Sequence, residues 1–171
     1  MKKIISLLTL IIVFGCCKKD NKDCESKVCN IEKTYTLNAS KVTITTGIWG
    51  TVSSMEGNCM PPIEANSKTC TNCPVQRTIK IYQYTTLSQA TPSGTSGVFY
   101  DSFSTPLVAQ VNADAEGFFQ LNLAAGNYTI AILENGKLYA NGFDGTGGIS
   151  PLSFSGGVQK VNLTMTYKAV F

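Results

Sequence analysis

From about residue 41 onward, apolar and polar side chains alternate along the chain, and this period of two limits the fold more than any other feature. The clearest case lies near the end, where Val161, Leu163, Met165 and Tyr167 alternate with polar residues. The same pattern runs through KVTITTGIWGTV, VQRTIKIY and the segments 107–111 and 119–123. Such alternation predicts half-buried β-strands with one face on a core. In NYTIAIL both faces are apolar, so this strand is predicted to be central.

Turn sequences separate these strands and fix the fold class. They are MEGN, TPSGTSG, DAEG, AAGN, ENGK and FDGTGG, and Asn135-Gly136 is a strong hairpin marker. No segment after residue 15 shows a convincing helical period. About seven short strands in one domain predict an all-β protein, a single Greek-key-type β-sandwich over residues 41–171, with a closed barrel as the alternative.

The order of these motifs resembles the carboxypeptidase regulatory-like, or transthyretin-like, β-sandwich. The resemblance covers about residues 47–134, with a closing strand at 157–167, and departs from the family at a cysteine-bearing insertion (59–74) and a long loop (85–106). It implies a non-catalytic module that is commonly appended to other proteins. The matching positions are Gly50, Val52, Gly57, Pro61 or Pro62, Asp114, Gly117, Phe119, Ala125, Gly126 and Tyr128. We expect Gly117 to adopt a positive φ, Phe119 to fill the core, and the Tyr128 hydroxyl to bond to nearby backbone.

The beginning of the chain has the pattern of a cleaved leader. Lys2 and Lys3 precede an uncharged apolar run from Ile4 to Phe14. A helix of that length spans about 16 Å, whereas a bilayer core is about 30 Å thick. We therefore expect residues 1–15 to be a signal peptide and not a transmembrane helix.

The sequence Val13-Phe14-Gly15-Cys16 resembles the lipobox of bacterial lipoproteins. The resemblance implies cleavage before Cys16, a diacylated thiol and an acylated amino group, which together anchor the chain stably in a membrane. The alternative is an ordinary secretory signal with a spare cysteine. The expected location is the cell envelope, at the outer membrane, with the periplasmic and surface faces both left open.

Residues 16–40 are expected to form a flexible, charged tether. The stretch KKDNKDCESKVCNIEK mixes charges of both signs and carries too little apolar surface to order itself. It resembles the charged export signals of surface lipoproteins of Bacteroidetes.

Charge and composition exclude several function classes. The net charge of +3 includes Lys2 and Lys3, so the chain without its leader carries only +1, which gives no footprint for nucleic acid. Histidine is absent, and this removes catalytic triads with histidine, Cys-His dyads and histidine metal sites. We expect no enzyme and no cofactor.

The remaining cysteines leave three interpretations open. Structural disulfides are the preferred one, because six cysteines remain besides Cys16 and the chain is expected to be exported. The preferred bridge joins Cys59 to Cys70 or Cys73, and the disulfide candidates are Cys24, Cys29, Cys59, Cys70 and Cys73. A four-thiolate zinc site and thiol-redox chemistry at Cys70 and Cys73 are the alternatives.

Two further patterns suggest ligands. Residues 112–117 (NADAEG) open like a calcium loop, but Leu123 stands where such a loop needs glutamate, and a hairpin turn is the preferred interpretation. Tyr82 and Tyr84 lie on the strand face opposite the core set and are candidates for an aromatic glycan-binding surface. The sequence thus predicts a lipid-anchored, non-enzymatic binding or assembly module, with an envelope protein or a glycan as its partner.

Overall fold

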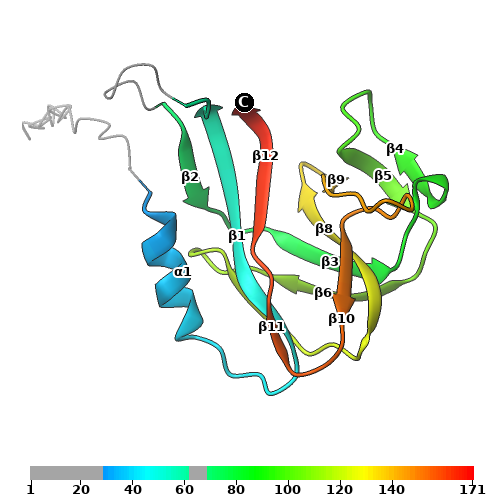
Figure 1. Cartoon of the computed structure of the whole chain (residues 1–171), viewed down its shortest axis with the longest axis horizontal. Coiled ribbons are helices and arrows are strands. Elements are labelled where there is room, and N and C mark those ends of the chain that lie inside the picture. Colours follow the sequence, from blue (N-terminus) through cyan, green and yellow to red (C-terminus); the bar gives the residue numbers. More distant parts are fainter. Residues whose placement is uncertain (1–28, 62–68) are drawn as a thin grey trace, which may run out of the picture.

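A computed structural model describes residues 29–61 and 69–171, and within them the chain forms an all-β sandwich with one short α-helix. Figure 1 shows two sheets facing each other, with the helix α1 (Ile31–Ala39) on the outer side of the smaller one. The all-β prediction is confirmed. The predicted number of strands is too low, because the described residues form twelve strands, several of only three or four residues.

The five-stranded sheet is built around one long strand, β1 (Gly47–Asn58). Its antiparallel neighbours are β2 (Thr71–Pro74) and β7 (Phe118–Leu121). Along its other edge it pairs in parallel, first with β11 (Val158–Lys160) and then with β12 (Leu163–Val170). The end of the chain therefore returns beside its first strand.

The seven-stranded sheet is antiparallel throughout. Its strands follow the order β4, β5, β9, β8, β3 and β6, and β10 pairs with the free part of β8. Strand β8 lies between β3 and the pair β9 and β10, which confirms that NYTIAIL is central. The bounds are β3 Thr78–Gln83, β4 Ala90–Pro92, β5 Phe99–Phe103, β6 Leu107–Asn112, β8 Gly126–Glu134, β9 Lys137–Tyr139 and β10 Pro151–Phe154; a 3₁₀ turn, η1, spans Leu87–Gln89.

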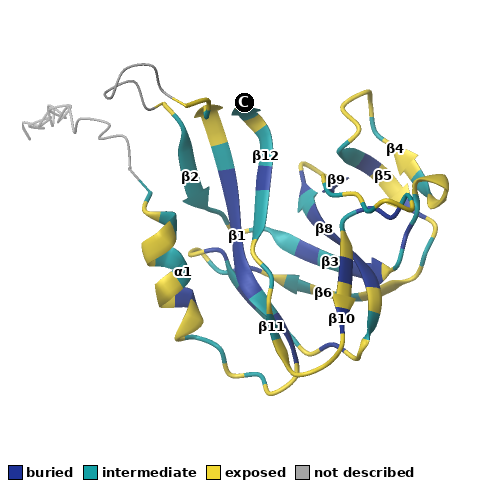
Figure 2. Ribbon diagram, in the orientation of Figure 1, coloured by how far each residue is buried: buried dark blue, intermediate teal, exposed yellow. Residues whose placement is uncertain are grey.

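The main core lies between the two sheets and follows the predicted alternation. Ile48 and Val52 of β1 face Ile79 and Ile81 of β3, and Phe119 fills the space beside them. Figure 2 shows the resulting buried stripes along β1, β3 and β8. A second apolar cluster lies against the opposite face of the larger sheet, under the segment that carries β4 and β5: Tyr82, Tyr100, Phe103, Ala131, Leu138, Ala140 and Ile149.

The turn positions adopt the conformations that the motifs predict. Asn135 and Gly136 both have positive φ, at 51° and 78°, as the two-residue turn between β8 and β9 requires. Gly117 has φ +71°, and a Cβ there would lie 2.3 Å from the carbonyl oxygen of Val52. Phe119 is buried, and the Tyr128 hydroxyl donates to the carbonyl of Ala124 at 2.9 Å. These positions therefore have structural roles.

The helix α1 corrects the prediction of a flexible tether over residues 16–40. Residues 31–39 are helical, and Asn30 caps the helix by accepting the N–H of Lys33 at 2.9 Å. Asn38 is fully buried, and its Nδ2 donates to Thr51 Oγ1 and to the Glu116 carbonyl, both at 2.9 Å. Residues 29–40 therefore belong to the folded domain and not to a flexible tether. The leader and residues 16–28 lie outside the described residues.

Candidate functional site

The described cysteines form two disulfides, one at β2 and one at the residue directly before it. Cys59 is bonded to Cys70, with an S–S distance of 2.04 Å, and Cys29 to Cys73, at 2.06 Å. Of the two partners expected for Cys59, the structure joins it to Cys70. The second bridge ties the segment before α1 to β2. Cys16, Cys17 and Cys24 lie outside the described residues.

This pairing bears on the redox and zinc interpretations of Cys70 and Cys73. The two sulfurs belong to different bridges and are not bonded to each other. A thioredoxin-like pair would instead join them across the two intervening residues. In the ranges 29–61 and 69–171, no group of three or more cysteine, aspartate or glutamate side chains is placed to hold a metal ion.

The prediction that Tyr82 and Tyr84 form an aromatic binding surface does not fit their positions in the fold. Tyr82 does lie on the face opposite the main core, but the segment 85–106 covers that face, and the Tyr82 ring packs edge-on against Phe103. Tyr84 is half-buried, and its hydroxyl donates to Asp144 Oδ2 at 2.6 Å. That bond and the N–H groups of Gly148 and Thr146 hold the pKa of Asp144 well below its ordinary value. Both tyrosines therefore hold loops in place.

Residues 112–117 form a tight turn, which was preferred over a calcium loop. The prediction of a hairpin is wrong, because the turn leads from β6 of the larger sheet to β7 of the smaller sheet, and these two strands do not pair with each other. Asp114 Oδ1 accepts the N–H groups of Glu116 and Phe118, each at 2.9 Å, and Oδ2 accepts from Lys41 Nζ at 2.8 Å. Burial acts to raise the pKa of Asp114, but these hydrogen bonds outweigh it and the pKa is lowered. The carboxylate thus stabilises the turn and ties it to the segment after α1.

At one end of the sandwich, the buried carboxylate of Glu134 in β8 forms an ion pair with the partly exposed Arg77 and a hydrogen bond to Tyr167 of the other sheet. Glu134 is 2% exposed and accepts hydrogen bonds from Nε and Nη2 of Arg77, the only arginine in the chain, and from the Tyr167 hydroxyl at 2.7 Å. Burial acts to raise the pKa of Glu134, but the bonds from Arg77 and Tyr167 outweigh it and the pKa is lowered. Both carboxylate oxygens of Glu134 accept hydrogen bonds from within the protein, which indicates a structural role.

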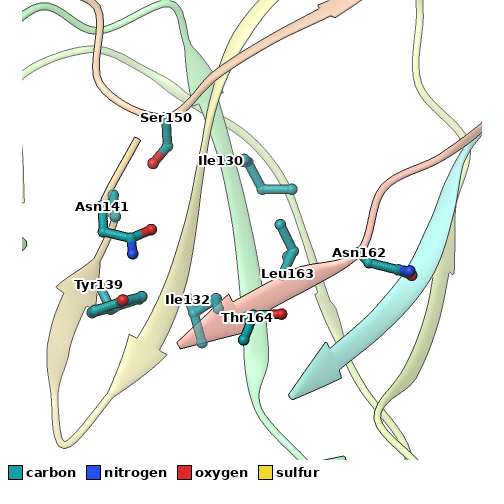
Figure 3. A pocket seen from close by; sticks show the side chains of 9 residues that line it. Ile130, Ile132, Tyr139, Asn141, Ser150, Asn162, Leu163 and Thr164 are labelled. Atoms are coloured by element: carbon teal, nitrogen blue, oxygen red, sulfur yellow. The ribbon is translucent and has the colours of Figure 1, made fainter. Parts of the chain in front are cut away.

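A pocket lies between the two sheets, beside the start of β12, and has a volume of about 130 Å³. Figure 3 shows Ser150 and Asn141 on one side and Ile130 and Leu163 across from them. The pocket is lined by Ile130, Ile132, Tyr139, Ala140, Asn141, Ser150, Asn162, Leu163 and Thr164. None of these side chains carries a charge at neutral pH. The lining combines aliphatic groups with amides and hydroxyls.

The polar side of the pocket is held in place by the loop between β9 and β10. Ser150 has φ +36°, a conformation that non-glycine residues rarely adopt. Its N–H donates to the Gly142 carbonyl at 2.6 Å, its carbonyl accepts from Ile130 at 3.1 Å, and its Oγ accepts from the Gly142 N–H at 3.0 Å. Three hydrogen bonds therefore fix the strained backbone and leave the hydroxyl proton for another acceptor.

Sequence reasoning did not find this pocket. Its lining comes from β8, β9, the following loop, and the beginning of β12, which are adjacent only after the sheets have formed. The one local signal is the glycine-rich stretch NGFDGTGGIS, which predicts a loop and no particular chemistry.

Comparison with protein-family models, with curated proteins and with solved structures gave no match. Among the helices of the described residues, none has the length and apolar character needed to cross a membrane.

Proposed function

We propose that the protein is a lipoprotein of the bacterial cell envelope, anchored through Cys16, whose disulfide-bonded β-sandwich is a non-enzymatic binding module. The observation that carries this proposal is the sequence Val13-Phe14-Gly15-Cys16 directly after a short apolar run. Two or more acyl chains on Cys16 would hold the protein on a membrane without a transmembrane helix. The expected site is the outer membrane.

The two disulfides support the assignment to an exported protein. Disulfides persist in the periplasm and outside the cell and are rare in the cytosol. Both bridges lie at the edge of the smaller sheet that carries β2, and one of them holds Cys29, the first described residue. Their position favours a role in securing the body to its anchor.

The Cys29–Cys73 bridge also limits how far the body lies from the membrane. Cys29 lies thirteen positions after Cys16 in the sequence. A chain extends at most about 3.3–3.6 Å per residue, so Cys29 lies within about 45 Å of the lipidated residue. A binding module held at that distance meets ligands and partners close to its own membrane.

The resemblance to regulatory-like β-sandwich modules supports binding or assembly over catalysis. Gly117, Phe119 and Tyr128 match that resemblance and have structural roles here. The thiol-redox alternative needs a bond between Cys70 and Cys73, and each has another partner.

Membrane fractionation of two adjacent cysteine variants tests the anchor. We expect wild-type protein in the membrane fraction, and Cys16→Ala in the soluble fraction or as an uncleaved precursor. Cys17→Ala is the matched control, because it removes the neighbouring thiol and leaves the lipobox intact; it should fractionate like wild type. Membrane association of Cys16→Ala as a processed chain, or loss of association in Cys17→Ala alone, would refute attachment at Cys16.

A further inference from the structure

We propose that the pocket between the sheets binds a single uncharged sugar ring, because Asn141 and Ser150 present hydrogen-bonding groups opposite the aliphatic wall of Ile130 and Leu163. This inference rests on the proposed binding role and names its ligand class. It moves the predicted glycan site away from Tyr82 and Tyr84, which the fold uses internally.

The volume of the pocket sets the size of the ligand. A cavity of about 150 Å³ in another protein is sufficient to hold benzene, and this pocket measures about 130 Å³. This pocket is smaller than that cavity, and a sugar ring with its hydroxyl groups is larger than benzene. The pocket therefore holds one edge of a single sugar ring, with the rest of the ring outside, and has no room for an oligosaccharide. The exposed side chain of Asn141 lies at the edge of the pocket. Further sugar units attached to the bound ring would extend past this edge into solvent. The fitting ligand is therefore a monosaccharide or the terminal unit of a glycan.

The lining chemistry selects a neutral, hydroxyl-rich ring. No lining side chain is a carboxylate, an amine or a guanidinium, so nothing there compensates a charged ligand. The only phenol, Tyr139, accepts the N–H of Thr166 at 2.9 Å and contacts the Thr166 hydroxyl at 3.3 Å. A sugar ring has C–H groups that suit the aliphatic wall and hydroxyl groups that suit amides and a serine.

Two polar groups at the pocket remain available for a ligand. Asn141 donates from Nδ2 to Thr166 Oγ1 at 3.0 Å, and its Oδ1 has no hydrogen-bond partner among the described residues. Ser150 accepts through Oγ from Gly142 and retains its proton as a donor. One acceptor and one donor on the same side match adjacent hydroxyl groups of a sugar.

The strained backbone of Ser150 supports a role in binding. Non-glycine residues held at positive φ cost free energy and tend to occur at functional sites. Glycine would adopt this conformation without strain, yet the position carries a side chain whose hydroxyl lies at the pocket. The substitution Ser150→Gly removes the hydroxyl and its bond to the Gly142 N–H, and it relieves the strain. The gain from the relieved strain offsets the lost bond, so the fold should tolerate the change.

The test is ligand-observed NMR titration of the purified full-length mature protein, in a detergent without a sugar head group. The probes are D-glucose, D-galactose, D-mannose and N-acetylglucosamine, with glucuronate and phenol as comparison ligands. We expect at least one neutral sugar to bind with a Kd below about 20 mM, and glucuronate and phenol to bind at least about tenfold more weakly.

Variants locate the binding site. Ser150→Gly and Asn141→Ala should each weaken sugar binding about tenfold, the effect of losing one well-placed hydrogen bond. Asn122→Ala is the matched control, because Asn122 is an exposed asparagine that does not line the pocket; its affinity should equal wild type. Thermal unfolding of each variant checks that the fold is intact.

Three results would overturn the inference: no binding of any of the four sugars, equal or tighter binding of phenol or glucuronate, or unchanged affinity in folded Ser150→Gly and Asn141→Ala. None of them bears on acylation of Cys16, and loss of the anchor would not alter sugar affinity. The two proposals therefore fail independently.

Discussion

At the scale of single residues, short-range hydrogen bonds stabilise the turns through which the chain crosses from one sheet to the other, before and after β7. Asp114 accepts two backbone N–H groups of its own turn, and Tyr128 bonds back to Ala124 four residues earlier. Such contacts connect residues that are close in sequence, so they depend little on the rest of the fold. This is why the roles of Gly117, Phe119 and Tyr128 could be predicted from local motifs.

The Tyr128 hydroxyl provides a direct test at this scale. Tyr128→Phe keeps the buried ring and removes only the bond to the Ala124 carbonyl. We expect a loss of about 1 kcal/mol in the free energy of unfolding, measured by urea denaturation. Tyr35→Phe is the control, since no hydrogen bond to the Tyr35 hydroxyl is found among the described residues. A loss of equal size in both variants would contradict a specific role for Tyr128.

The ionisation of Glu134 should make the stability of the protein depend on pH. Its pKa is lowered in the folded state from an ordinary value of 4.5. The ion pair therefore stabilises the fold above the unfolded-state pKa, and this contribution is lost as the pH falls through the folded-state pKa. Glu134→Gln should lower the free energy of unfolding by about 2 kcal/mol at pH 7. The loss is smaller than for breaking a fully buried ion pair, because Arg77 is one-third exposed.

Urea denaturation of wild type and Glu134→Gln between pH 7 and pH 3 checks this prediction. The difference between the two proteins should shrink below pH 4.5 as the wild type loses its ion pair. Glu32→Gln, at an exposed position of α1, controls for the general effect of removing a carboxylate. A difference that stays constant over this pH range would show that the contribution of Glu134 to stability does not depend on its charge.

At the scale of elements, the two segments whose structure the sequence did not predict are held by contacts with distant parts of the chain. The helix α1 has one fully buried residue, Asn38, so no apolar stripe marks it in the sequence. The segment 85–106 was expected to be a loop, but it forms β4 and β5 and covers Tyr82. In both cases the decisive partner lies on another element, and alternation within one segment carries no information about it.

The two disulfides should have separable effects on α1. Replacing both cysteines of the Cys29–Cys73 bridge by serine removes a cross-link between positions 44 residues apart. This should lower the free energy of unfolding by about 4 kcal/mol. The same double replacement at Cys59 and Cys70 removes a cross-link between positions 11 residues apart and should lower the free energy of unfolding by about 3 kcal/mol. Only the first should reduce hydrogen-exchange protection of residues 31–39. Equal loss of protection in both variants would contradict a specific link between Cys29 and the helix.

At the scale of the whole molecule, β1 is the strand on which the smaller sheet depends. It pairs with β2, β7, β11 and β12, and two of these pairings are parallel. The alternating pattern correctly predicted strands and a sandwich, but parallel pairing between the first and last strands connects positions more than 100 residues apart. Nothing in either segment specifies that partner, which is why the layers were predictable and their connections were not.

Gly50 tests this arrangement, because it lies where β12 follows β11 along β1. A Cβ at Gly50 would lie 1.9 Å from the carbonyl oxygen of Val161. We expect Gly50→Ala to lower the free energy of unfolding by more than about 3 kcal/mol, since backbone must move. Gly145→Ala is the control, because a Cβ there has no atom within 4 Å. A well-folded Gly50→Ala with wild-type stability would contradict the close pairing of β1 with the end of the chain.

The most direct test of the central claim is mass spectrometry of the N-terminal peptide of the protein recovered from its native membrane. The account predicts that the chain begins at Cys16, with a diacylglyceryl group on the sulfur and an acyl group on the new amine. A processed chain whose Cys16 carries a free or disulfide-bonded sulfur, recovered from the culture supernatant, would contradict it.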